Sequence, residues 1–216
     1  MHIRIRPWAQ KELDECEYFI KDPLTMKGKW TDCFSKKQPL HIELGCGKCV
    51  STCKMAHEQQ NINFIAIDVI SMILGMGRRF IAEEYGKDPI DNLFLTRFNI
   101  LNFSEYFSEN DKADRIYISF CNPWERKKKQ HKRRLTHPRQ LEQYKTVMKP
   151  ESEIWFKTDN DALWLDSLDY FRECGFDIVY KTEDLHASGF TPNYYTEHEI
   201  KFTEQNIPIK FLIAKL

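Results

Sequence analysis

The apolar residues of this chain occur in short continuous runs that alternate with longer amphipathic stretches, and few folds are compatible with that order. Continuously apolar runs are typical of parallel strands covered on both faces, whereas apolar residues repeating every three to four positions are typical of helices. The predicted strands are Leu40–Leu44, Phe64–Val69, Asn92–Phe98, Arg115–Phe120, Glu153–Lys157, Asp177–Tyr180 and Ile207–Ala214. The predicted helices are Thr52–Gln59, Ser71–Tyr85, Arg139–Met148 and Asp161–Cys174. This alternation predicts an α/β fold with a doubly wound, mostly parallel sheet.

The two ends of the chain depart from the alternation. With 216 residues the chain is long for one average domain and short for two, so we expect a single domain, residues 36–216, after an N-terminal extension of residues 1–35. The segment Thr182–Asn206 lacks helical periodicity and is predicted to be a loop. The strand after it is predicted to run antiparallel, at or near an edge of the sheet.

Composition argues against several classes of protein. The 42% of hydrophobic residues suffices for a sizeable core, and no apolar run approaches the roughly 18 residues of a membrane helix. Because Met1–Trp8 also lacks the apolar centre of a secretory signal, we expect a cytoplasmic protein with no membrane partner. Seven cysteines, an odd number, indicate reduced thiols. Cys46 and Cys49 have the spacing of a metal or redox motif, but no second close pair accompanies them, so we expect no bound metal.

A glycine-rich turn follows the first predicted strand and opens the first predicted helix. Gly45 and Gly47 let the backbone approach a ligand closely, and Asp68, at the end of the second strand, can accept both hydroxyls of a ribose. These features fit NAD as well as S-adenosylmethionine, since both contain adenosine. Glu43 distinguishes them, because its carboxylate would repel a pyrophosphate but suits the ammonium of a methionine moiety. The turn therefore predicts an S-adenosylmethionine site.

Two further strand ends are predicted to reach the same edge of the sheet. Asn99, with the backbone of Ile100, follows the third strand and is placed to meet the adenine edge, although a turn-forming asparagine would look the same. Asn122, with Pro123 and Trp124, follows the fourth strand. An amide and an indole there would read and stack on a base, although a turn cap and a core anchor are the simpler alternative.

A dense run of positive charge comes directly after that turn. The net charge of the chain is zero, yet residues 126–134 are almost uniformly basic. A one-signed cluster beside a presumed reaction centre indicates a phosphate-binding surface, here for nucleic acid. Arg4 and Arg6 are predicted to extend it.

An ordered series of motifs resembles the bacterial tRNA (guanine-N7)-methyltransferases over nearly the whole chain. The motifs are Arg4-Ile-Arg-Pro-Trp8-Ala, Glu43-Leu-Gly-Cys-Gly47, Phe64-Ile-Ala-Ile-Asp68, Asn122-Pro-Trp124, Lys132-Arg-Arg-Leu-Thr136, Phe156-Lys-Thr-Asp159-Asn160 and Thr196-Glu-His-Glu199-Ile-Lys-Phe202. The resemblance implies a Rossmann-like methyltransferase fold, S-adenosylmethionine as methyl donor, and a guanosine of the tRNA variable loop as acceptor.

The resemblance also implies roles for individual residues. The cofactor would be held by Glu43, Gly45, Gly47, Asp68, Asn99, Ile100 and Asn122. The tRNA would be held by Arg126, Lys128, Lys129, Lys132, Arg133, Asp159, Thr196, Glu197, His198 and Glu199. Asn122 occupies the position that the family treats as catalytic.

The chain departs from the family pattern at several of these positions. Asn99 and Asn122 stand where aspartates are usual, Arg126 replaces a lysine and Glu125 a common proline. Cys49 replaces a third glycine, so we expect the backbone there to suit a side chain.

The chemistry tolerates an amide at the catalytic position. Guanine N7 has a lone pair and no proton, so alignment, and not a general base, is required. Other interpretations are another base methyltransferase, a catalytically silent RNA-binding relative and, disfavoured by Glu43, a nicotinamide oxidoreductase.

Overall fold

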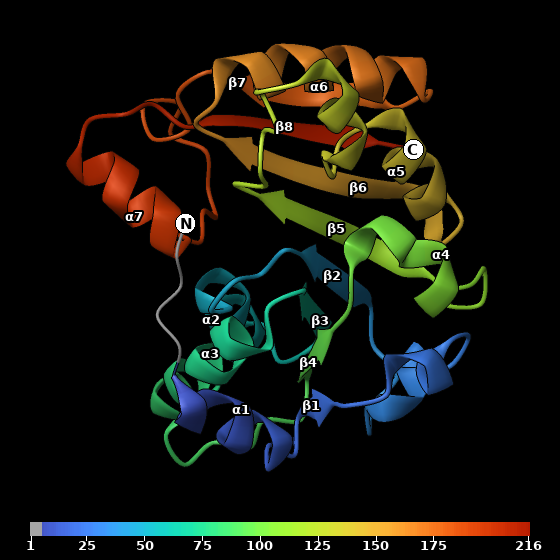
Figure 1. Cartoon of the computed structure of the whole chain (residues 1–216), viewed down its shortest axis with the longest axis vertical. Helices are drawn as coiled ribbons and strands as arrows, with labels where there is room; N and C mark the ends of the chain where they lie inside the picture. The colour runs from blue at the N-terminus through green and yellow to red at the C-terminus, as the bar shows by residue number, and fades with distance from the viewer. Residues whose placement is uncertain (1–5) are drawn as a thin grey trace.

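The computed structural model describes residues 6–216, and within them the chain forms one eight-stranded sheet in the order β1-β4-β3-β2-β5-β6-β8-β7 (Figure 1). The strands are β1 Phe19–Ile20, β2 Leu40–Leu44, β3 Asn63–Asp68, β4 Leu93–Arg97, β5 Ala113–Ser119, β6 Met148–Thr158, β7 Asp177–Thr182 and β8 Lys210–Lys215. The α-helices are α1 Pro7–Asp14, α2 Val50–Glu58, α3 Ser71–Tyr85, α4 Phe103–Tyr106, α5 Pro138–Lys145, α6 Asp161–Glu173 and α7 Glu197–Glu204. The 3-10 helices are η1 Pro23–Met26, η2 Trp30–Cys33, η3 Ile100–Asn102 and η4 Lys128–Arg133.

The sheet confirms the predicted fold class. β1 to β6 pair in parallel, and β8 runs antiparallel between β6 and β7, near the edge as expected. The predicted strands correspond to β2–β8 and the predicted helices to α2, α3, α5 and α6, with shifts at the ends. β1 and α1, in the N-terminal extension, were not predicted.

The two faces of the sheet bury different side chains because successive residues of a strand point in opposite directions. On one face Ile42, Ile116 and Phe156 belong to a core completed by α4, α5 and α6. On the other face Phe64 and Ala66 pack with α2 and α3 (Figure 1). Glu43 alternates with Ile42, so it points to the α2 face.

Two glycines of α3 allow backbones to touch. A Cβ added at Gly75 would lie 2.1 Å from the Ala9 carbonyl oxygen of α1. A Cβ added at Gly77 would lie 2.6 Å from the Lys48 carbonyl oxygen, in the loop between β2 and α2. No side chain fits at either position, so α3 holds both α1 and that loop at close range.

The predicted loop Thr182–Asn206 is wrong in part, since it contains α7. The Thr196 hydroxyl oxygen accepts a hydrogen bond from the Glu199 amide at 3.0 Å and caps the helix. Glu199 is the buried residue of α7, so a charged side chain anchors the helix. The apolar stripe that reveals a helix in a sequence is therefore missing.

Candidate functional site

The carboxyl ends of β2, β3, β4 and β5 open into a cleft of about 620 Å³. The chain winds outward from β2 in one direction and from β5 in the other, and open α/β sheets bind ligands at such a reversal. All residues predicted to hold the cofactor line the cleft, namely Glu43, Gly45, Gly47, Asp68, Asn99, Ile100 and Asn122. Of the predicted tRNA contacts it includes Arg133, Thr196, Glu197 and His198.

The glycine loop has a left-handed backbone at three positions. The φ angles are +83° at Gly45, +56° at Gly47 and +59° at Cys49. Our expectation that position 49 suits a side chain is wrong, because an L-residue with a Cβ pays an energetic cost in this conformation. The Cys49 side chain is fully buried against α2 and α3.

Glu43 lies at the floor of the cleft and is 2% exposed. Its carboxylate accepts hydrogen bonds from the hydroxyls of Thr52 and, at 3.3 Å, Ser51, both in α2. Burial raises the pKa of Glu43, although the two hydroxyls and Lys157 act in the opposite direction. The cleft therefore contains a buried carboxylate whose hydrogen-bond donors are uncharged hydroxyls.

Asp68 is the last residue of β3 and lies against the glycine loop. One carboxylate oxygen accepts the Gly47 amide at 3.0 Å, and the other accepts the Ile70 amide at 2.9 Å. Burial raises the pKa of Asp68, against these backbone hydrogen bonds. The carboxylate is thus held in place by the main chain, with oxygen lone pairs left for a ligand.

The two asparagines of the cleft use their side chains in the same way. The Asn99 Oδ1 accepts the Leu101 amide at 3.2 Å, and the Asn122 Oδ1 accepts the Trp124 amide at 3.0 Å. Each asparagine therefore stabilises a turn, which is the simpler of the two roles that the sequence allows for it. Each also has its amide –NH₂ left to donate into the cleft, because its oxygen is turned toward the main chain.

The turn after β5 is conformationally strained. Phe120 has φ +52° and Trp124 has φ +48°, so two bulky residues on either side of Asn122 are left-handed. Strain of this kind costs of order 1–3 kcal/mol per residue and persists where surrounding contacts fix it. The Arg133 guanidinium lies 5.1 Å from the Trp124 ring centre, which is within cation–π range.

The basic run folds as η4 and its flanks. Arg126 and four side chains of η4 are exposed: Lys128, Lys129, Lys132 and Arg133. Arg134 is 1% exposed; its Nε donates to the Pro123 carbonyl at 2.6 Å and its guanidinium pairs with Asp166 of α6. Arg134 belongs to the same basic run in the sequence, yet it is buried. Its hydrogen bond to Pro123 holds the end of η4 against the turn that contains Asn122.

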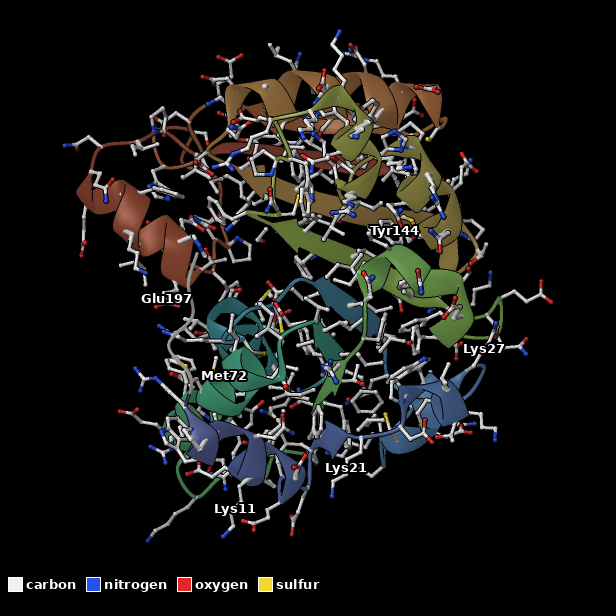
Figure 2. All side chains as sticks on the ribbon, in the orientation of Figure 1. Lys11, Lys21, Lys27, Met72, Tyr144 and Glu197 are labelled. Atoms are coloured by element: carbon white, nitrogen blue, oxygen red, sulfur yellow. The ribbon has the colours of Figure 1, made fainter. Side chains whose placement is uncertain are left out.

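α7 closes the other side of the cleft. Glu197, at its first turn, pairs with Lys48 of the glycine loop at 2.7 Å, and Figure 2 shows Glu197 at the end of α7 nearest α2 and α3. The His198 ring stacks on Phe120 with centroids 5.9 Å apart. Both contacts join α7 to the loops that follow β2 and β5.

Six predicted tRNA contacts do not line the cleft: the three exposed lysines of η4, Lys128, Lys129 and Lys132, and also Arg126, Asp159 and Glu199. Glu199 is 0% exposed, and its carboxylate is occupied by Lys157, His186 and Asn193, so it is not accessible to a base in this structure. Asp159 lies just beyond β6, where its carbonyl accepts from Lys210 at 3.4 Å. Arg126 is exposed outside the cleft.

Sequence reasoning also missed Lys48 and Arg134. Lys48 looks like an ordinary loop residue, and its partner Glu197 is far away in the sequence. Arg134 looks like one more charge in a basic run, and no periodicity separates it from its exposed neighbours. The prediction for Arg4 concerns a residue outside the described part of the chain, whereas Arg6 lines the cleft.

The cysteines of the loop lie in an apolar surrounding. Burial raises the pKa of the Cys46 and Cys53 thiols, and all seven cysteines are free. Between residues 6 and 216 there is no group of three or more His, Cys, Asp or Glu able to hold a metal ion. Over the same residues, no helix has the length and apolar character needed to cross a bilayer.

Known proteins resemble the chain along almost its full length. The family model described as "Putative methyltransferase" matches residues 37–212. A tRNA (guanine-N(7)-)-methyltransferase of Clostridium botulinum is 50% identical over 216 residues, covering 99% of this chain and 98% of that protein. The chain belongs to the tRNA (guanine-N(7)-)-methyltransferase family. A family member from Clostridium beijerinckii is also 50% identical, with 99% and 98% coverage.

Solved structures place this family member among Rossmann-like methyltransferases by fold. The 16S rRNA methyltransferase KamB has a TM-score of 0.63 at 13% identity, covering 87% of this chain and 92% of that one. An antibiotic-related methyltransferase has a TM-score of 0.57 at 18% identity, covering 100% and 96%. The predicted family and fold class are both confirmed.

Proposed function

We propose that this family member transfers a methyl group from S-adenosylmethionine to N7 of a guanosine in the variable loop of tRNA. One observation carries the proposal: the cleft that contains Glu43, Asp68, Asn99 and Asn122 is bordered by Arg133 of the exposed basic helix η4. A cofactor site and a phosphate-binding surface thus share one opening.

The residues of the cleft fit S-adenosylmethionine better than a dinucleotide. Glu43 is a buried carboxylate without a cation among its hydrogen-bond partners, which favours a cationic ligand group and disfavours a pyrophosphate. At Gly47 an added Cβ would meet nothing within 4 Å, so the loop leaves space for a ligand against the backbone.

Each cleft residue then has a distinct task. Glu43 would receive the ammonium of the methionine moiety, and Asp68 the ribose hydroxyls. Asn99 would donate its free –NH₂ to an adenine ring nitrogen, beside the Ile100 backbone. When bound, the cofactor supplies an electrophilic methyl group on a sulfonium that is already a good leaving group.

On the substrate side the chain supplies alignment. Trp124 would stack on the base, and the –NH₂ of Asn122 would donate to it or to the methionine moiety. Thr196, Glu197 and His198 line the facing wall. Since N7 has no proton to lose, holding it in line with the methyl group is the main requirement, and near-attack alignment alone can supply about 7–11 kcal/mol.

The decisive experiment is to incubate the protein with unmodified tRNA and S-adenosylmethionine, digest the RNA to nucleosides and identify the product by mass and retention. We expect 7-methylguanosine, and a tRNA without the variable-loop guanosine should yield none. A different methylated nucleoside would indicate another base methyltransferase. Tight tRNA binding without any methylation would indicate a silent RNA-binding relative.

A further inference from the structure

Lys157 of β6 is a buried ammonium for which the proposed reaction has no direct use. The side chain is 8% exposed. Its Nζ donates to Glu199 Oε2 at 2.9 Å, to the Tyr194 carbonyl at 3.1 Å and to Asn193 Oδ1. All three of its donors are therefore used, which is what a buried ammonium requires.

The register of the sheet brings Lys157 to the same face as Glu43. Glu43 pairs with Tyr117, Tyr117 pairs with Trp155, and Lys157 follows two residues later on β6. Residues two apart in a strand share a face. Glu43 and Lys157 accordingly line one cavity of about 20 Å³, behind the cofactor cleft.

Lys157 is thus hydrogen-bonded to one buried carboxylate, Glu199, and lines a cavity with a second, Glu43. Burial opposes ionisation of Glu199, but Lys157, Asn193 and His186 together hold its pKa below the ordinary value. Burial lowers the pKa of Lys157, and Glu199 and Glu43 both oppose that change. Of these two carboxylates, Glu199 is the one that accepts a hydrogen bond from Lys157. Glu43 lines the same cavity as Lys157, and its carboxylate also opposes the lowering of the Lys157 pKa.

We propose that Lys157 is a positioning residue that couples cofactor binding at Glu43 to the placement of α7 over the substrate base. The inference rests on the proposed function. A cofactor ammonium bound at Glu43 would neutralise that carboxylate, so that the charge of Lys157 acts on Glu199 alone. Glu199 is the buried residue that fixes α7. Binding at either site then favours binding at the other, and such couplings are reciprocal.

The other groups facing this cluster come from several elements. Besides burial, the negative charge of Asp68, in β3, raises the pKa of Glu43. Glu43 in turn adds to the effect of burial in raising the pKa of Cys46, in the glycine loop, and of Tyr117, in β5. His186, in the segment before α7, lies 2.9 Å from Glu199. Lys157 acts on the pKa of both Glu43 and Glu199, and it lines a cavity together with Glu43.

The test measures the affinity of S-adenosylhomocysteine, an unreactive product, by calorimetry with and without saturating tRNA. In the wild type we expect tRNA to increase that affinity, typically by about 5- to 150-fold for coupled sites. In Lys157→Met the increase should disappear, and kcat should fall on the order of 100-fold, since α7 is no longer held in register. Lys210→Met is the matched control: Lys210 is also 8% exposed, but it pairs with Asp161 of α6.

A second variant covers the possibility that Lys157→Met fails to fold with two unpaired carboxylates. Lys157→Met/Glu199→Gln removes the stranded charge, and it should bind S-adenosylhomocysteine with an affinity that tRNA does not change. Retained coupling in this double variant, or lost coupling in Lys210→Met, would overturn the proposal. A wild type that methylates tRNA but shows no coupling would overturn it while leaving the proposed function intact. A wild type that binds no cofactor would remove both.

Discussion

Cys49 has a left-handed backbone although it carries a buried side chain. That conformation costs a residue with a Cβ about 1–2 kcal/mol relative to glycine. We therefore expect Cys49→Gly to be more stable than Cys49→Ala by about 1 kcal/mol in urea unfolding, since both lose the sulfur and only glycine relieves the strain. Cys53 in α2 is the control, because glycine should there be worse than alanine by about 1 kcal/mol. If alanine were more stable than glycine at position 49 as well as at position 53, the backbone of Cys49 would not be strained.

The raised pKa of Glu43 predicts how cofactor binding depends on pH. A cationic ligand group needs the ionised carboxylate, and burial raises the pKa of Glu43. Affinity for S-adenosylmethionine should therefore rise with pH through that raised pKa, and be lost on acidification earlier than an ordinary glutamate would allow. Glu43→Gln should bind about 1–3 kcal/mol more weakly and lose most of this dependence. Calorimetry over a pH series checks this, with Asp68→Asn reporting the contribution of the other carboxylate.

Asn122 tests whether the reaction needs a base. Asn122→Asp keeps the oxygen that accepts the Trp124 amide, so we expect it to remain active. Asn122→Ala removes that hydrogen bond and the free –NH₂, and a misplacement of about 1 Å can cost on the order of 100-fold in rate. Single-turnover transfer at saturating tRNA and cofactor measures both. A wild-type rate that rises with pH while binding stays constant would reveal a general base and refute the alignment argument.

Among the elements, η4 carries the prediction for RNA binding. If its side chains contact phosphates, replacing Lys129 and Lys132 by glutamine should reduce the slope of log K against log salt by roughly 1–2. Affinity for S-adenosylmethionine should not change. The control removes two exposed lysines outside the cleft, Lys21 and Lys87; Figure 2 shows Lys21 beside β1, at the lower end of the molecule. An equal loss of slope in the control would mean that general charge, and not η4, drives binding.

α7 shows why part of the site was beyond sequence reasoning. The family resemblance identifies the motif from Thr196 to Glu199, but the sequence does not predict the helix, because the buried anchor is a glutamate. Burial of that glutamate depends on Lys157, which ends an apolar run in a distant strand. A partnership between charges so far apart in sequence has no local pattern.

For the whole molecule, the doubly wound, mostly parallel character of the sheet and the place of the cleft could be predicted because both follow from local patterns. Continuously apolar strands gave β2 to β6, and the glycine turn with Asp68 marked the edge where ligands bind. The extension was less accessible. β1 has only two residues, and the eight-residue α1 buries just Ala9 and Leu13, which is too short an apolar pattern to identify a helix by itself.

The backbone contacts of Gly75 and Gly77 also have a dynamic consequence. A side-chain contact can adapt by changing rotamer, but two main chains in contact must move together, so α1, α3 and the glycine loop should open as one cooperative unit. In native-state hydrogen exchange we expect the amides of α1 and of residues 45–49 to share one opening free energy, distinct from that of α5 on the opposite face. Gly75→Ala should then speed exchange in the glycine loop as well as in α1. A mutation at the contact between α1 and α3 would thereby affect the cofactor cleft without altering any residue that lines it.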